Sequence, residues 1–394
     1  MIGVTERPRL RAASRRSEST LIGFLRSLDW ILMAAAAGLI GYGLWVVSGI
    51  TRFDVPGAED YFVVRQGFAA AVGVVGLVAA ALIPIDLWRR YWKLVYGATI
   101  GLVVVVFVAA EAVRGSKRWL DLGVIQFQPS ELGKVLFVLA IAGFVVDRVG
   151  PVTRWRTIFA VIGLSAAPIF LVFVQPDLGT ALVYAASLFA VLFFVGVRWR
   201  QLIVLLAIGA LGITSILWLL PAAGVQVLKP YQTARLTLDP SADPSGITYN
   251  LDQSITAVGS GGLTGRGVIE ASQTRLDYLP EHATDFAFAS LAEQRGFVGC
   301  AILLLLYLLV VWRGLRVITG AGDLYGVVVA GGLVVGFLFQ VFVNVGMTMG
   351  VAPVTGIPLP FVTVGGSSMV ANLVLIGVLQ GIHARGDLGR SGLP

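Results

Sequence analysis

Long apolar runs separated by short polar segments form most of the chain. Each run has about 20 residues, the length that an α-helix needs to cross the hydrocarbon core of a bilayer. Ten such runs are expected, with the bounds 29–49, 66–84, 92–112, 131–147, 156–174, 178–197, 201–221, 286–311, 324–347 and 364–383. The pattern therefore predicts an all-α polytopic membrane protein with about ten transmembrane helices.

The composition supports this class and excludes a water-soluble domain. Hydrophobic residues make up 57% of the 394 residues and charged residues only 13%, whereas soluble domains contain about 25% charged residues. Cys300 lies in an apolar run, and we expect it to be a packing residue. A single cysteine and two histidines exclude an intramolecular disulfide and the Cys/His spacings of zinc sites.

The charged residues are distributed unequally between alternate loops. One set of loops, together with both termini, holds about 18 of the 29 Lys and Arg but only about 7 of the 22 Asp and Glu. Because basic residues are retained in cytoplasmic loops, both termini are predicted to be cytoplasmic. The net charge of +7 then follows from topology, and we exclude nucleic acid as a partner. The basic tail 1–28 is expected to rest on anionic membrane lipids.

The opposite, extracytoplasmic side carries the unusual polar sequence. A long loop, 223–285, joins the seventh and eighth runs, and three shorter polar segments read RGSKRWLDLGVIQFQPSELGK, VQPDLGT and VTGIPLPFVTVGGSS. We predict one transmembrane domain over 29–384, followed by a cytoplasmic tail over 385–394. Because the polar segments gather on one side, any chemistry is expected there.

Two charged residues stand three positions apart where the fourth run begins. Pro129 and Ser130 favour a helix start, so Glu131 and Lys134 are expected on one helix face, where they can form an ion pair. The pair can be purely structural. It can also mark a substrate path, as ionisable groups at membrane depth usually do.

A tight turn between the fifth and sixth runs contains Gln175 and Asp177. Asp177 fits equally well as the N-cap of the sixth helix, where its carboxylate would accept from a free amide, and as a functional carboxylate. The residue pattern leaves both interpretations open.

The segment GIPLPFVTVGGSS is predicted to be non-helical backbone that leads into the last helix. Such backbone is tolerated at membrane depth only where protein buries it or where it lines a cavity. Gly365 and Gly366 permit close approach or unusual dihedrals. Ser367 and Ser368 offer hydroxyls and helix-start amides, which are suited to an anionic group.

Asp285 precedes the eighth run, close to Glu281 and His282. It can be an ordinary N-cap carboxylate that the helix dipole favours. Alternatively, it is a carboxylate at the edge of a low-dielectric cavity, where it can serve as a general base. No known catalytic triad fits the three residues.

Together these positions predict a polar cavity that opens on the extracytoplasmic side. Its charged lining would consist of Arg118, Glu131, Lys134, Asp177 and Asp285. Mixed charges of this kind suit an amphiphilic anionic substrate such as a lipid phosphate. The physical reading of the residues ends at that substrate class.

Five segments, in this order, resemble the SEDS family of bacterial cell-wall proteins, the group of RodA, FtsW and SpoVE. They read GSKRWLDLGVIQFQPSELGKVLF, VQPDLGTAL, LKPYQTARLTLDPSADPSGITYNLDQSITAVGSGGLTGRG, LPEHATDFAFASLAEQRGFVG and GIPLPFVTVGGSS. The resemblance covers about residues 25–385. QPDLGTAL and GIPLPF are more similar to the elongation subgroup, RodA, than to the division subgroup, FtsW.

The resemblance implies peptidoglycan glycosyltransferase activity on lipid II, for cell elongation and shape. It also implies a ten-span helical fold in the bacterial cytoplasmic membrane and a class B penicillin-binding protein as partner. The family's essential aspartate falls on Asp285, its Glu and Lys fall on Glu131 and Lys134, and the Arg of its RW motif falls on Arg118. A divalent cation such as Mg²⁺ or Mn²⁺ is implied as a cofactor, although no metal motif stands in this chain.

The chain departs from the family pattern at two places. Ala283 stands where the family commonly has a histidine, and His282 comes one residue earlier. Thr363 and Val364 replace the usual Ser-Tyr before GGSS. Two other functions stay open beside polymerisation: a lipid II flippase, which would need polar groups across the whole bilayer, and a non-catalytic scaffold for the penicillin-binding protein.

Overall fold

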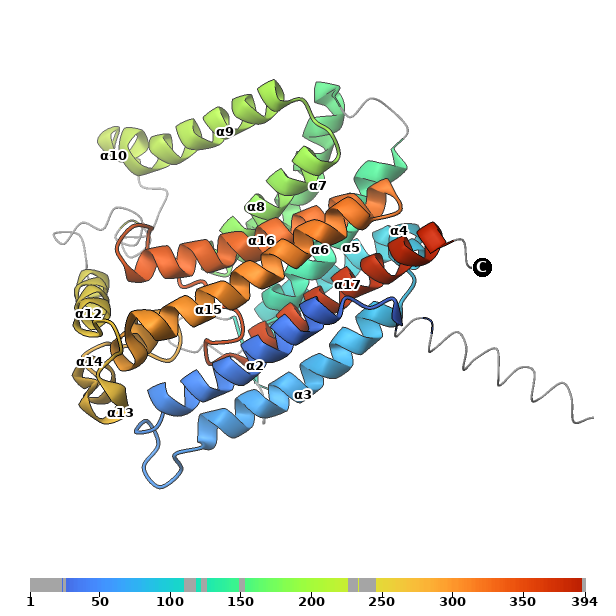
Figure 1. Ribbon diagram of the computed structural model, residues 1–394. Coiled ribbons are helices and arrows are strands. Elements are labelled where there is room, and N and C mark those ends of the chain that lie inside the picture. Colours follow the sequence, from blue (N-terminus) through green and yellow to red (C-terminus); the bar gives the residue numbers. More distant parts are fainter. Residues whose placement is uncertain are drawn as a thin grey trace, which may run out of the picture.

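Long helices that run side by side make up the computed structural model (Figure 1), which describes residues 23, 26–109, 118–121, 126–148, 153–225, 233 and 246–391. The first helices are α2 (Trp30–Ile50), α3 (Tyr61–Leu82), α4 (Ile85–Arg90), α5 (Trp92–Ala109), α6 (Pro129–Asp147), α7 (Trp155–Val174) and α8 (Leu178–Phe194). They are followed by α9 (Trp199–Thr214), which continues through η1 (Ser215–Leu219) and α10 (Leu220–Ala222). The rest are α12 (Ile247–Ser260), α13 (Gly267–Glu270), α14 (Ser272–Arg275), α15 (Ala287–Gly320), α16 (Leu324–Thr348) and α17 (Gly366–Ser391).

Nine of the ten predicted spans each correspond to one helix, and the seventh corresponds to the continuous run of α9, η1 and α10, which confirms the all-α polytopic class. Within the described ranges, nine helices are long and apolar enough to cross a membrane, and α8 is a shorter apolar helix of 17 residues. Some predicted boundaries are wrong. The second span, α3, begins at Tyr61 rather than at 66, and α17 extends to Ser391, through most of the predicted tail. The predicted basic tail falls largely on residues outside the described ranges.

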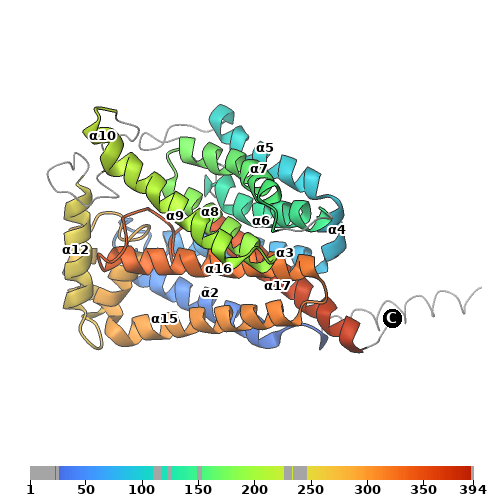
Figure 2. The same ribbon diagram turned by 90° about the horizontal axis from the view of Figure 1, so that it is seen from above.

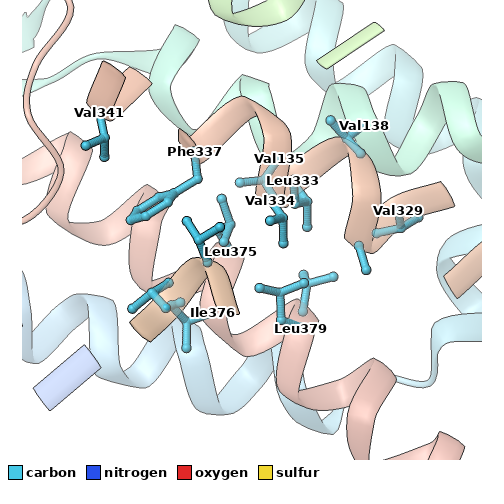
Figure 3. Close-up of a cluster of buried hydrophobic side chains, with 14 of the residues drawn as sticks. Val135, Val138, Val329, Leu333, Val334, Phe337, Val341, Leu375, Ile376 and Leu379 are labelled. Atoms are coloured by element: carbon cyan, nitrogen blue, oxygen red, sulfur yellow. The ribbon is translucent and has the colours of Figure 1, made fainter. Parts of the chain in front are cut away.

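The core lies where α6, α16 and α17 meet. These are the most enclosed of the nine long spans: 83%, 72% and 83% of the residues in their most apolar 18-residue stretches are buried. Figure 3 shows the side chains that interlock there, among them Val135 and Val138 of α6, Phe337 of α16 and Leu375 of α17. Since lipid is as apolar as these side chains, close packing rather than exclusion from water holds such helices together.

One glycine of α17 permits a very close approach to α3. A Cβ atom on Gly377 would lie 2.3 Å from the carbonyl oxygen of Leu77. Small residues at helix interfaces allow backbones to approach in this way. The contact fixes the last helix against the second span.

Several helices begin at one end of the bundle, which we call the site end: α6, α8, α15 and α17. The short helices α12, α13 and α14 lie beside the start of α15 at this end (Figure 1). They form part of the predicted loop 223–285, most of whose residues from 226 to 245 are outside the described ranges. The predicted loop is therefore partly helical.

The span formed by α9, η1 and α10 is the least enclosed of the nine long spans, since only 11% of its most apolar 18-residue stretch is buried. Figures 1 and 2 show it along the outside of the bundle, beyond α7 and α8. The span α15 contains a sharp kink, because Gly296 has φ 64° and ψ −163°. Only glycine adopts such dihedrals readily, so this residue separates the buried start of α15 from its longer second part.

Candidate functional site

Asp177 is the centre of a buried polar cluster. Its Oδ2 accepts from Gln128 Nε2 at 2.7 Å and from Ser130 Oγ at 3.3 Å. Its Oδ1 accepts from the amide of Thr180 at 3.2 Å and lies 3.9 Å from a guanidinium nitrogen of Arg118. Asp177 therefore caps α8, which confirms the N-cap interpretation, and also contacts Arg118, Gln128 and Ser130. The functional interpretation stays a prediction.

A short hairpin carries Arg118 and Gln128 to this cluster. Its strands β1 (Leu120–Asp121) and β2 (Gln126–Phe127) are antiparallel, and Leu120 pairs with Phe127. The hydroxyl of Ser367 accepts from the amide of Gln128 at 2.7 Å and donates to the carbonyl of Gln126 at 2.9 Å. The hairpin is thus fixed to the start of α17.

Glu131 and Lys134 form the expected ion pair, with 2.9 Å between Lys134 Nζ and Glu131 Oε2. Both side chains are deeply buried, 1% exposed for Glu131 and 11% for Lys134. Lys134 Nζ also donates to Gln340 Oε1 at 2.9 Å. Glu131 Oε1 is buried without a hydrogen-bond partner among the described residues, so the pair leaves one strong acceptor unused.

The segment from Val351 to Gly365 is non-helical, as predicted, and side chains from the bundle bind its backbone. Gln340 donates to the carbonyl of Pro358 at 2.7 Å, and Tyr307 donates to the carbonyl of Pro360. Gln66 donates to the carbonyl of Thr363 at 3.1 Å and accepts from the amide of Gly365 at 3.2 Å. Buried protein groups therefore satisfy this backbone at membrane depth.

The conformational expectation for the paired glycines is wrong. Neither Gly365 nor Gly366 has a positive φ, and a Cβ atom on Gly365 would meet no atom closer than 4.0 Å. The left-handed conformation occurs at Phe361 instead, with φ 67°. The two glycines begin α17 without close packing around Gly365.

Asp285 lies just before α15 at the site end and is partly exposed. Phe286 occupies the cap position of α15, so the alternative in which Asp285 caps this helix is wrong. The Asp285 carbonyl accepts from Asn344 Nδ2 at 3.2 Å. The preceding carbonyls of Ala283 and Thr284 accept from the loop that ends at Gly365. The segment that carries Asp285 is therefore held by backbone contacts on two sides.

Two other candidates make only internal contacts. Gln175 ends α7, and its Nε2 donates to the carbonyl of Val103 on α5 at 2.6 Å. Ser368 Oγ accepts from Asn372 Nδ2 at 3.2 Å. Both side chains are buried. Gln175 and Ser368 are thus used in packing, and they lie further from exposed surface than Asp285.

His282 joins two loops at the site end. Its Nε2 lies 3.0 Å from Asp54 in the α2–α3 loop, and its Nδ1 lies 3.5 Å from Asp277. Burial lowers the pKa of His282, but the hydrogen bond and charge of Asp54 and the charge of Asp277 outweigh it, so the pKa is raised above its ordinary value. Glu281, in a left-handed conformation with φ 56°, accepts from Thr284 Oγ1.

Two spaces in the described part of the chain differ from the single polar cavity expected from the sequence. A small one, about 20 Å³, lies beside Lys134 and Gln340 and is otherwise mainly apolar. A groove of about 610 Å³ lies between α12 and α15 and is lined by apolar side chains such as Phe288 and Phe297. Neither space is lined by Asp285, Asp177 or Arg118, so neither is the expected cavity around all the charged candidates.

The described ranges contain no group of three or more His, Cys, Asp or Glu that could hold a metal ion. Two candidate carboxylates are already engaged: Asp177 by three hydrogen-bond donors and the charge of Arg118, and Glu131 by Lys134. The residues present therefore do not fit a divalent cation held by protein ligands alone.

Sequence reasoning missed four amide side chains that organise the site: Gln66, Gln128, Gln340 and Asn344. Gln340 and Asn344 stand four residues apart in the apolar run FLFQVFVNVG, and this spacing places them on one helix face. Two uncharged polar residues on one face of a span were the signal that could have identified them.

Comparison with known proteins gives a consistent result over nearly the whole chain. The family model of the cell cycle proteins FtsW, RodA and SpoVE matches residues 26–387. The chain is 39% identical to the peptidoglycan glycosyltransferase MrdB of Escherichia coli strain K12, over 88% of this chain and 92% of MrdB. It is 35% identical to the stage V sporulation protein E of Bacillus subtilis, over 90% of this chain and 97% of that protein.

Solved structures agree with these relatives. A chain from a peptidoglycan synthase complex that coordinates polymerization and crosslinking aligns with a TM-score of 0.76 and 30% identity, covering 91% of this chain and 98% of that one. The rod shape determining protein RodA of Thermus thermophilus aligns with a TM-score of 0.65 and 27% identity, covering 90% of this chain and 96% of RodA.

Proposed function

The chain belongs to the family of FtsW, RodA and SpoVE, and we propose that it is a peptidoglycan glycosyltransferase that polymerises lipid II into glycan strands. One observation carries the proposal. Hydrogen bonds join the Asp285 segment, the buried Lys134 and the loop before α17 into one network at the site end. The similarity to the peptidoglycan glycosyltransferase MrdB, which extends over almost the full length of both chains, agrees with it.

Asp285 is the general base of the proposed reaction. Its carboxylate removes the proton from the acceptor hydroxyl of one lipid II molecule, and that oxygen attacks the anomeric carbon of the growing strand. The bond from this carbon to the diphosphate breaks, and undecaprenyl diphosphate leaves with the electron pair. The partly exposed position of Asp285 before α15 allows a substrate hydroxyl to reach it.

Lys134 and Arg118 stabilise the diphosphate leaving group. Fixed cations in a site that excludes water stabilise a developing anion strongly. Glu131 holds Lys134 through the 2.9 Å ion pair, and Asp177 lies beside Arg118. Gly365, Gly366, Ser367 and Ser368 form the start of α17, whose helix dipole favours the same anion.

The site is assigned to the extracytoplasmic face of the bacterial cytoplasmic membrane, with both termini in the cytoplasm. The positive-inside distribution of Lys and Arg supports this orientation. We assign a class B penicillin-binding protein as partner, since a structural relative comes from a peptidoglycan synthase complex. The role in cell elongation rests on the similarity to MrdB and RodA.

Strand synthesis in detergent tests the proposal, because transport across a bilayer gives no covalent product there. The purified full-length chain receives labelled lipid II beside a penicillin-binding protein with an inactivated transpeptidase. We expect polymer from wild type and from Asp252→Asn, a matched control at an exposed acid of α12, and none from Asp285→Ala. Polymer from Asp285→Ala at the wild-type rate would remove Asp285 as the base.

The flippase alternative makes the opposite prediction. If no variant and no wild type forms polymer, while wild type moves lipid II across liposomes, the chain is a transporter. Intact activity of an unmodified partner beside Asp285→Ala would favour a scaffold role. Strand synthesis, lipid II transport and partner activity thus separate the three functions.

A further inference from the structure

Two buried amides on α16 have no role in the proposed mechanism. Gln340 is 2% exposed and Asn344 is fully buried, and their spacing of four residues places them one turn apart on the same helix face. Polar side chains inside a membrane span are retained only where they find partners. Their partners therefore indicate what the two residues do.

Gln340 connects the ammonium group of Lys134 to the loop before α17. Its Oε1 accepts from Lys134 Nζ at 2.9 Å, and its Nε2 donates to the Pro358 carbonyl at 2.7 Å. The orientation of the amide is determined by these partners, because an ammonium group only donates and a carbonyl only accepts. Both ends of the side chain are therefore used at once.

Asn344 connects the candidate base to the same loop. Its Nδ2 donates to the Asp285 carbonyl at 3.2 Å and to the Ile357 carbonyl at 2.7 Å. Its Oδ1 is buried without a hydrogen-bond partner among the described residues. An unpaired buried acceptor lowers stability, so stability alone does not explain an amide at this position.

The two amides bind neighbouring carbonyls, those of Ile357 and Pro358. The chain of contacts runs from the Asp285 segment through Asn344 to the loop, and through Gln340 to Lys134. All its members except the Asp285 segment are buried or nearly so. Buried hydrogen-bonded groups therefore join the Asp285 segment to Lys134.

We infer that Gln340 and Asn344 are positioning residues, which together set the distance between the base Asp285 and the cation Lys134. The inference rests on the proposed function, since it assigns those two roles. Asn344 fixes the backbone that carries Asp285, and Gln340 fixes the ammonium group that faces the diphosphate. Neither amide touches the reacting atoms.

The test compares Asn344→Leu and Gln340→Met with Gln380→Met. Gln380 is a matched control, because it is also fully buried in a span and makes two hydrogen bonds, to the amide and carbonyl of Asp29 at 2.9 and 2.8 Å. It lies on α17 near the end opposite the site. Each variant is purified in detergent, its thermal unfolding is recorded, and kcat and KM for lipid II are measured beside the inactivated partner.

We expect Asn344→Leu to lower kcat by about 10- to 100-fold with little change in KM, because a shift of about 1 Å in a catalytic group costs up to about 100-fold. The acidic limb of its kcat–pH profile, along which the general base becomes protonated, should also move. Gln340→Met should also lower kcat, since Lys134 then loses one anchor and stabilises the leaving diphosphate less. Gln380→Met should lose thermal stability while its kcat, KM and pH profile stay at wild-type values.

Equal loss of kcat in Asn344→Leu and Gln380→Met at equal loss of thermal stability would overturn the inference. So would an Asn344→Leu variant with wild-type kcat and pH profile. Asn344→Gln, which retains the two N–H donors, should recover part of the lost kcat. Absence of polymer from wild type would instead contradict the proposed function, so the two failures are distinguishable.

Discussion

Removing the positive charge at Lys134 tests whether the Glu131–Lys134 pair serves stability or function. Lys134→Met removes the cation that pairs with the Glu131 carboxylate, and the Glu131 side chain is only 1% exposed. The other oxygen of this carboxylate has no hydrogen-bond partner among the described residues. Breaking a buried ion pair by removing one member costs about 3–5 kcal/mol. Replacing both members by neutral groups of similar shape is often close to neutral.

The double variant Glu131→Gln/Lys134→Met should therefore recover most of the stability that Lys134→Met loses. Unfolding of the four proteins in the thermodynamic cycle is followed in detergent with a denaturant titration, and polymerisation of labelled lipid II is measured on the folded fractions. We expect the double variant to be folded and inactive, as the role of Lys134 at the diphosphate requires. A stable double variant with wild-type polymerisation would refute that role and leave the pair purely structural.

Two further outcomes follow from local geometry. Gly296→Ala should destabilise the protein by at least about 1–3 kcal/mol in a denaturant titration, because φ 64° with ψ −163° is strained for alanine. The added Cβ would also lie 2.3 Å from the amide nitrogen of Gly265. An alanine variant as stable as wild type would contradict the kink at this residue. The raised pKa of His282 means that its contact with Asp54 stabilises fully below the ordinary histidine pKa of about 6.5 and is lost as pH rises through the raised value. The stability difference between wild type and His282→Gln should thus shrink on going from pH 6 to pH 9, and a constant difference would exclude this linkage.

The number and type of the spans could be predicted because each requires a long apolar run, and such runs are visible without knowledge of neighbours. Their ends could not be predicted as well. The eighth run was expected to end at 311, whereas α15 continues to Gly320, since the apolar and basic residues beyond the membrane core still favour a helix. Gly296 gave no sign of its kink, because glycine is common in membrane helices.

The charged part of the site was visible in the sequence for the same kind of reason. Glu131, Lys134 and Asp177 are conspicuous beside apolar runs, where charges are rare. Their contacts were less accessible. The carboxylate of Asp177 caps α8 and also contacts Ser130 and Arg118, and only the folded chain shows that one side chain does both. Neither of the two spaces described above is lined by all the charges that were expected around one cavity.

The positions of the charged residues depend on neutral ones that composition does not mark. An amide costs less to bury than a charge. Gln340 and Asn344 therefore stand within a span whose most apolar 18-residue stretch still has a mean hydropathy of 2.3. Yet these amides hold the carbonyls of the loop before α17, and through that loop they connect Asp285 to Lys134. A substitution that keeps every charge can therefore separate base from cation. Charge identifies the chemistry of this site, and the buried amides determine its geometry.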